Sequence, residues 1–342
     1  MSTIRIDGSQ GEGGGQIVRS SLALSLATGT PIVIENIRAG RKRPGLMRQH
    51  RTALLAAAEI GHAEVEGAEV GSKSLSFAPQ TIAGGDYTFS IGTAGSTTLV
   101  LQTIVLALLR ADGPSRVQIE GGTHNPFAPP FDYLEKVYVP LLRRMGAEIE
   151  ITLERPGFYP AGGGVIIVET QPIGRFEPID LTERGELRKI TGRVWLSALP
   201  RSIADREIAE LCNRMTLDRG AIEVEDVADP VGPGNAVHLQ VESDGITELF
   251  TTFGEHHVSA ERVARNVAEE VRRYLKSGLP VGPYLADQIV LPLALAGGGA
   301  FATTAPTRHT KTHIDVIERF LPVRVTETRL DRHHHRFEVE KI

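Results

Sequence analysis

The sequence contains one cysteine, Cys212, and few aromatic residues. A single thiol excludes an intramolecular disulfide and any metal site built from several cysteines, and it fits a reducing compartment. Cys212 lies in a helix-like stretch, and we interpret it as a small, buried apolar residue rather than a nucleophile. Because aromatic residues make up only 5% of the chain, leucine, isoleucine, valine and alanine must supply most of the core.

Long apolar runs and an excess of positive charge are also missing. No stretch reaches the roughly 18 apolar residues of a membrane span, and residues 1–7 lack the apolar run of a signal peptide. We therefore expect a soluble, cytoplasmic protein that has no membrane partner. The formal net charge of −5 argues against a protein that coats nucleic acid, but it allows a local basic pocket.

An internal repeat organises the 342 residues. An alternating strand, a turn, an apolar helix and a second strand occur near residue 4, again near residue 87, and in a more divergent copy that starts near Val281. Each copy continues with a second helix and two strands, so the unit reads β-α-β-α-β-β. The first helices are expected at residues 16–28, 97–110 and 285–295, and the second helices at residues 46–60, 132–145 and 314–320.

Residues 183–277 lie between the second and third copies and predict a smaller, inserted α/β domain. Strand patterns at 189–196 and 236–242 alternate with helix patterns at 204–215 and 259–276. The fold class is therefore α/β (α+β), with a catalytic domain formed by residues 1–182 together with 278–342. We find no catalytic signature in the insert, so substrate docking, a homodimer contact and a purely structural role all stay open.

A glycine-rich segment, Gly11–Gln16, opens the first helix. Glycines let backbone N–H groups approach an anion at a helix N-terminus, although the segment is neither a Walker loop nor a dinucleotide fingerprint. Such a turn is structural more often than functional, but an acidic side chain there repels phosphate unless a hard cation bridges them. Glu12 is therefore a candidate ligand for Mg²⁺. Arg19, one turn into the helix, interrupts an apolar face and is expected to point back at this loop.

A basic segment, Ile37–Arg51, contains five arginines and one lysine in a chain that is acidic overall. A solvated basic loop would explain it. Arginine forks, however, suit bidentate contacts to phosphate, so we favour binding of a phosphate or of an RNA end.

Two histidine-containing segments follow the third copy's strand. His309 is expected between that strand and the next helix, where α/β units carry functional groups. A neutral imidazole there is a good nucleophile towards phosphorus. His309 and His313 have helical spacing for a metal site, but no acidic third ligand is near in sequence. The run His333–His335 is best explained as a polar hairpin turn.

Several longer stretches, in this order along almost the whole chain, resemble one family. They are Asp7–Gln16, Ile37–Arg41 with Pro44–Leu46, Phe158–Gly164, Tyr284–Gln288 and Glu318–Pro322. Together they resemble the RNA 3′-terminal phosphate cyclases. The resemblance implies three repeats of a folding unit shared with enolpyruvyl transferases, plus an inserted thioredoxin-like domain.

The resemblance also implies an activity and its site. The expected reaction converts an RNA 3′-phosphate end to a 2′,3′-cyclic phosphate with ATP and Mg²⁺ or Mn²⁺, through adenylylated His309. Glu12 matches the carboxylate beside the metal, and Pro129 and Tyr284 are expected to enclose the adenine ring. Relatives often have asparagine where this chain has His313. Polar residues around the phosphates and the RNA end would be Arg19, Arg38, Arg41 and Gln49, and nucleotide-binding positions would be Gln102, Tyr284, Leu285, Ala286, Asp287 and Gln288.

Two alternatives stay open from the sequence. An enolpyruvyl transferase would share the repeat but would need no histidine–AMP. A non-catalytic relative acting in ribosome assembly would lack the nucleophile. The presence of His309 at the expected place argues against this alternative.

Overall fold

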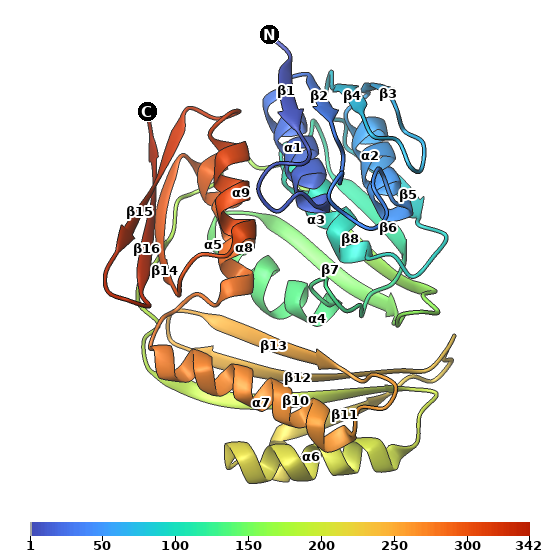
Figure 1. Cartoon of the computed structure of the whole chain (residues 1–342), viewed down its shortest axis with the longest axis vertical. Coiled ribbons are helices and arrows are strands. Elements are labelled where there is room, and N and C mark those ends of the chain that lie inside the picture. Colours follow the sequence, from blue (N-terminus) through green and yellow to red (C-terminus); the bar gives the residue numbers. More distant parts are fainter. Residues whose placement is uncertain (1) are drawn as a thin grey trace.

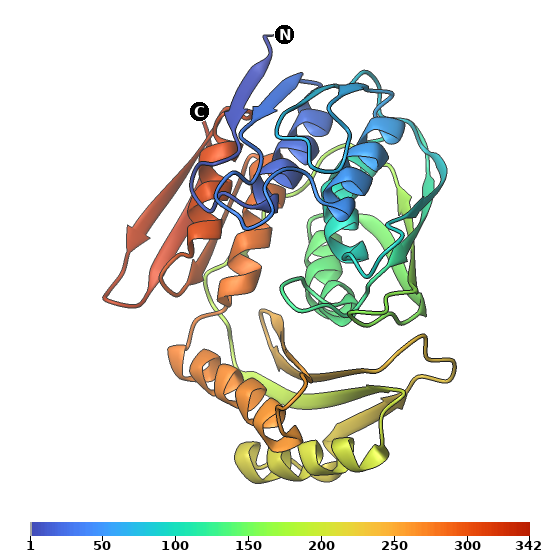
Figure 2. The same cartoon turned by 45° about the vertical axis from the view of Figure 1, so that its right-hand side comes forward.

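The computed structural model describes residues 2–342 and, within them, four mixed sheets of four strands each. Three sheets surround a group of helices in the upper part of the molecule, and the fourth forms a separate body below with its own helices (Figure 1). The turned view in Figure 2 shows the same two bodies joined by two chain crossings near residues 180 and 280. Among the described residues, no helix is long and apolar enough to cross a membrane.

The three upper sheets share one topology. In each, the first strand pairs in parallel with the second, the second pairs antiparallel with the fourth, and the third lies at the far edge. Parallel neighbours require a crossover, which a helix supplies in every case. The strands are, in spatial order, β1 (Ile4–Asp7), β2 (Ile32–Glu35), β4 (Leu75–Ala78) and β3 (Glu64–Glu66); β5 (Gly85–Ser90), β6 (Ser115–Gly121), β8 (Gly164–Gln171) and β7 (Glu148–Arg155); β9 (Asp180–Leu181), β14 (Gly298–Thr303), β16 (His335–Lys341) and β15 (Val323–Arg329).

The third sheet differs from the expectation in where it begins. The sequence pattern suggests a start near Val281, but the strand that pairs in parallel with β14 is β9, which precedes the segment 183–277. That segment therefore leaves the chain between the first strand and the first helix of the third sheet, rather than between two units. A two-residue strand is too short for any alternating pattern to reveal it. The exact domain limits stay predictions.

Apolar helices fill the space between the upper sheets. The first helix of each unit is buried nearly all round, as its apolar sequence requires, and α1, α3 and their neighbours α2, α8 and α9 form one continuous core. The helices are α1 (Gly15–Thr28), α2 (Arg48–Ile60), α3 (Thr97–Leu108), α4 (Phe131–Tyr133) continuing through a π-helical turn (Leu134–Tyr138) into α5 (Val139–Arg144), α8 (Pro283–Ala296) and α9 (Arg308–Ile317).

The start of α9 corrects the expected position of His309. The sequence places a helix at 314–320, whereas the observed helix begins at Arg308, so His309 lies in its first turn. The reason is a capping box: the Thr307 hydroxyl accepts a hydrogen bond from the Thr310 amide (3.0 Å), and the Thr310 hydroxyl accepts one from the Thr307 amide (3.2 Å).

The lower body has its own core between one sheet and two helices. Its sheet runs in the order β11-β10-β12-β13, and the amphipathic α7 packs on β12 and β13. The edge strand β13 also contacts α4 and the π-helical turn of the upper body. The elements are β10 (Leu187–Ser197), α6 (Arg201–Met215), β11 (Ile222–Asp226), β12 (Gly234–Ser243), β13 (Thr247–Phe253) and α7 (Ala260–Ser277).

Candidate active site

The glycine-rich loop before α1 is held against the start of α9. Gly11 and Gly13 have left-handed φ angles of 56° and 60°, which glycine adopts without strain. The amide of Glu12 donates to the Thr312 hydroxyl (3.0 Å), although the two residues are 300 positions apart. Gly15 is required for close approach, because a Cβ there would lie 2.2 Å from Nε2 of His50. The loop therefore presents Glu12 to the first turn of α9.

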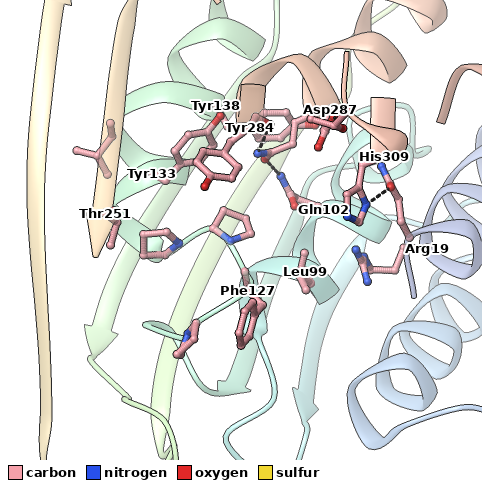
Figure 3. Close-up of a pocket in the computed structure, with 18 of the residues that line it drawn as sticks. Arg19, Leu99, Gln102, Phe127, Tyr133, Tyr138, Thr251, Tyr284, Asp287 and His309 are labelled. Atoms are coloured by element: carbon pink, nitrogen blue, oxygen red, sulfur yellow. Dashed lines mark hydrogen bonds between the residues drawn. The ribbon is translucent and has the colours of Figure 1, made fainter. Parts of the chain in front are cut away.

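His309 is the side chain that this arrangement brings to Glu12. Its Nδ1 lies 2.8 Å from Oε1 of Gln16, in the first turn of α1 (Figure 3). An amide oxygen only accepts, so Nδ1 carries the proton and Nε2 has the lone pair. Nε2 in turn lies 4.0 Å from Oε1 of Glu12. The imidazole is thus oriented with its nucleophilic nitrogen towards the glycine-rich loop.

The surroundings of His309 favour its neutral form. Partial burial lowers its pKa, the positive charges of Arg19 and Arg41 lower it further, and only the Asp287 carboxylate opposes them. Arg19 remains charged at neutral pH, although burial lowers its own pKa to about 10. A neutral imidazole beside two guanidinium groups is suited to attack an electron-poor phosphorus that carries negative oxygens.

Glu12 has one carboxylate oxygen paired and one open. Oε1 forms an ion pair with Arg41, whose guanidinium also donates to the backbone oxygen of Glu12 (3.2 Å). Oε2 is buried and has no hydrogen-bond partner in the part of the chain that the structure describes. A buried anionic oxygen without a donor is costly, so the site fits a hard cation at this oxygen.

A cavity of about 700 Å³ opens beside His309, within the usual size range of small-molecule sites. Its walls come from α1, α3, the segment 126–130, α8 and α9 of the upper body, and from β13 and α7 of the lower body. Figure 3 shows His309 and Arg19 at one end, and Phe127 and Thr251 on the other walls. Seven residues that the sequence assigns to the site line it, as does His313: Arg19, Gln102, Pro129, Tyr284, Asp287, Gln288 and His309.

Hydrogen bonds connect the cavity walls to one another. The side chains of Gln102 on α3 and Gln288 on α8 are bonded to each other, which links the two apolar helices. The Asp287 carboxylate accepts from the hydroxyl of the α9 cap residue Thr307 (2.8 Å), and burial raises the pKa of Asp287. Tyr284 is 58% exposed and presents its ring to the cavity.

Other residues named from the sequence lie outside the cavity. Arg38 donates to the backbone oxygens of Arg43 (2.8 Å) and Gly45 (2.9 Å) and so holds its own loop. Gln49 accepts from the Ser96 amide (3.1 Å). Leu285 and Ala286 are buried on the core side of α8, and Arg41, which does not line the cavity, pairs with Glu12.

Sequence reasoning missed two parts of the site. In the sequence, Gln16 is identified only as the end of the glycine-rich segment. Its position in the first turn of a predicted helix could have indicated a role beside that loop. No sequence motif points to the wall formed by Thr251, Asn266 and Glu270, because these residues belong to the inserted segment, which has no catalytic signature. His313 is buried, and its Nδ1 donates to the backbone oxygen of Asp287 (2.8 Å), so it supports α8 rather than facing Glu12.

Two comparisons with known proteins bear on this chain. The enolpyruvyl transferase NikO from Streptomyces tendae aligns with 98% of this chain at 10% sequence identity and a TM-score of 0.38, and the chain spans only 48% of that structure. The family described as RNA 3′-terminal phosphate cyclase matches residues 10–326, which includes the glycine-rich loop, the cavity helices and His309. The chain therefore belongs to the RNA 3′-terminal phosphate cyclase family.

Proposed function

We propose that this protein uses ATP to convert an RNA 3′-terminal phosphate to a 2′,3′-cyclic phosphate, through an adenylylated His309. The observation that carries the proposal is the orientation of His309, whose Nδ1 proton is engaged by Gln16 while Nε2 faces the glycine-rich loop and Glu12.

The cavity has the features that an adenosine requires. Tyr284 and Pro129 line it and would offer apolar surface to a purine, while Gln102 and Gln288 would supply amide groups for its polar edge. In that pose the triphosphate would point towards Arg19 and the amides of the glycine-rich loop, both of which favour anions.

A divalent cation fits beside Glu12. The open oxygen Oε2 would hold it, and Arg41 keeps the carboxylate in place. When bound, Mg²⁺ or Mn²⁺ would neutralise charge on the phosphate oxygens.

His309 would act in the first of three steps. Its Nε2 would form a bond to the α-phosphorus of ATP as the bond from that phosphorus to the pyrophosphate oxygen breaks, which leaves AMP on the histidine. Arg19 and the loop amides would stabilise the charge that builds up on the phosphate oxygens.

The two later steps pass the AMP on. An oxygen of the RNA 3′-phosphate would attack the AMP phosphorus and release His309. The 2′-hydroxyl of the same ribose would then attack the 3′-phosphorus and expel AMP, with the advantage of an intramolecular reaction. The wall from β13 and α7 would face the RNA end in these steps.

An RNA with a 2′-deoxy terminal ribose tests this sequence of steps. Such an end should accept AMP but give no cyclic product, whereas the matched ribose end should give cyclic phosphate that resists phosphatase. Cyclic product from the deoxy end would refute the third step. Turnover of neither end, together with no labelled protein from α-³²P-ATP, would refute the proposal as a whole.

A further inference from the structure

A second cluster of ligand-type side chains lies apart from the cavity of His309, where the two bodies meet. His124 follows β6, Asp132 lies in α4, and His238 lies on β12 of the lower body. One ligand atom from each lies within 4.8 Å of the other two, and all three residues are buried. They are 1%, 3% and 1% exposed, respectively. Three segments distant in sequence therefore place two imidazoles and one carboxylate around one point.

We propose that His124, Asp132 and His238 bind a divalent transition-metal ion, Zn²⁺ foremost, which fastens the inserted body to the upper body. Two imidazoles and a carboxylate are a donor set that suits Zn²⁺. The proposal is independent of the cyclase reaction.

The ligand spacing fits this ion. Oδ2 of Asp132 lies 2.9 Å from Nε2 of His124 and 3.5 Å from Nε2 of His238. Zinc bonds to nitrogen and oxygen of about 2.0–2.2 Å place tetrahedral ligands roughly 3.3 Å apart. An ion can therefore be accommodated with small movements of the side chains.

One atom in the cluster has no partner without an ion. Nε2 of His238 is buried, makes no hydrogen bond within residues 2–342 and points at the carboxylate. An imidazole nitrogen that has no hydrogen-bond partner in a buried polar cluster is available to bind an ion.

The groups behind the ligands orient them. The Thr123 hydroxyl lies 2.8 Å from Nδ1 of His124, and the Thr251 hydroxyl lies 2.7 Å from Nδ1 of His238, so both rings turn Nε2 towards Asp132. Arg193 and Trp195 both donate to Oδ1 of Asp132, at 3.1 Å and 3.3 Å. Oδ2 is hydrogen-bonded to Nε2 of His124 (2.9 Å), and the ion would take the place of this bond. Such outer hydrogen bonds usually accompany metal-binding histidines and carboxylates.

A route to the cluster exists. A second cavity of about 300 Å³ is lined by Asp132 and His238 and also by Lys136, Lys189 and Arg193. Each of these three cations is paired with a carboxylate, those of Glu135, Glu242 and Glu223 respectively. The route is therefore polar and locally neutralised, and a water molecule from this cavity would serve as the fourth ligand.

Metal binding by the full-length chain tests the proposal. The protein is stripped with a chelator, dialysed and titrated with ZnCl₂ by calorimetry, and its metal content is then measured by elemental mass spectrometry. One equivalent of Zn²⁺ is expected to bind. Free Zn²⁺ at about 100 times its Kd should raise the Tm by about 4 °C. No uptake by the wild type would overturn the proposal without recourse to any variant.

Variants locate the ion. His238→Asn and His124→Gln should each lose the bound equivalent and the Tm shift. The matched control is the double variant His333→Ala/His334→Ala, which removes two histidines from the turn between β15 and β16 and should retain both. If His238→Asn retains the bound Zn²⁺, or if the control variant loses it, the ion binds at a surface site and the proposal is overturned.

Cobalt serves as a second readout that does not depend on whether a variant folds. Co²⁺ added to the stripped wild type should give the visible absorption of a four-coordinate site, and Zn²⁺ should abolish it. A spectrum like that of free, hydrated Co²⁺ would contradict a site formed by protein ligands.

Discussion

Replacement of Gln16 by glutamate should change the pH at which His309 can react. Gln16 accepts the Nδ1 proton of His309 at 2.8 Å. Gln16→Glu keeps an acceptor of similar size but adds a negative charge, which stabilises the imidazolium and raises the pKa of His309. If neutral His309 is the nucleophile, the acid limb of the pH–rate profile for protein adenylylation must move to higher pH.

The size of the shift follows from the distance and the exposure. Two unit charges about 4 Å apart interact by about 4 kcal/mol at an effective dielectric constant of 20, and by about 1 kcal/mol in water. The His309 side chain is 48% exposed, so the interaction lies between these limits. An energy of about 1.5–3 kcal/mol corresponds to a rise of about 1–2 pKa units.

The assay is single-turnover labelling of the protein with α-³²P-ATP between pH 5 and pH 9. Gln16→Leu is the control, because it removes the acceptor without adding charge. It should slow labelling about tenfold through lost orientation, without moving the acid limb upward. An unmoved limb in Gln16→Glu, or an equal upward shift in Gln16→Leu, would refute this account of His309.

Three further predictions concern other residues of the chain. Glu12→Gln should reduce labelling about 100-fold and weaken its dependence on Mg²⁺, because the open carboxylate oxygen is lost; an unchanged Mg²⁺ titration would exclude Glu12 as the ligand. Tyr284→Ala should raise the KM for ATP about tenfold through lost stacking, and a KM equal to that of the wild type would remove Tyr284 from the adenine site. Glu248 is buried, accepts from the Gly282 amide (2.6 Å) and has its pKa raised to about 8 by burial. Because folding raises the pKa of this carboxyl, the folded protein loses stability as the pH rises from about 4.5 to 8. Glu248→Gln removes this loss. Its free energy of unfolding minus that of the wild type should therefore be up to about 5 kcal/mol larger at pH 8 than at pH 4. Denaturant titrations at the two pH values measure this, and an equal difference at both would contradict it.

The regular elements follow from sequence patterns, whereas the joins between them do not. The apolar helices α1, α3 and α8 begin within two residues of their expected positions, because burial on all sides leaves an unmistakable run of apolar residues. The sequence does not predict the short strand β9, because two residues are too few to show the alternating hydrophobic pattern of a strand. The start of α9 was expected six residues too late, because its first turn is polar and is stabilised by the cap at Thr307 rather than by an apolar face.

The site shows the same division. Seven of the residues assigned to the site from the sequence line the cavity, and Glu12 lies beside His309. The hydrogen bond between Gln16 and His309, and the contact of Glu12 with Thr312, join residues about 300 positions apart. No local pattern encodes such pairs, because they depend on how the first and third sheets pack. The cluster of His124, Asp132 and His238 is hidden for the same reason.

The central claim is that His309 carries AMP. Wild-type protein and His309→Ala should be incubated with α-³²P-ATP and Mg²⁺ and separated on a denaturing gel. The account predicts an acid-labile label on the wild type that is absent from the variant. An equal label on both proteins, or no label on the wild type with either Mg²⁺ or Mn²⁺, would contradict it.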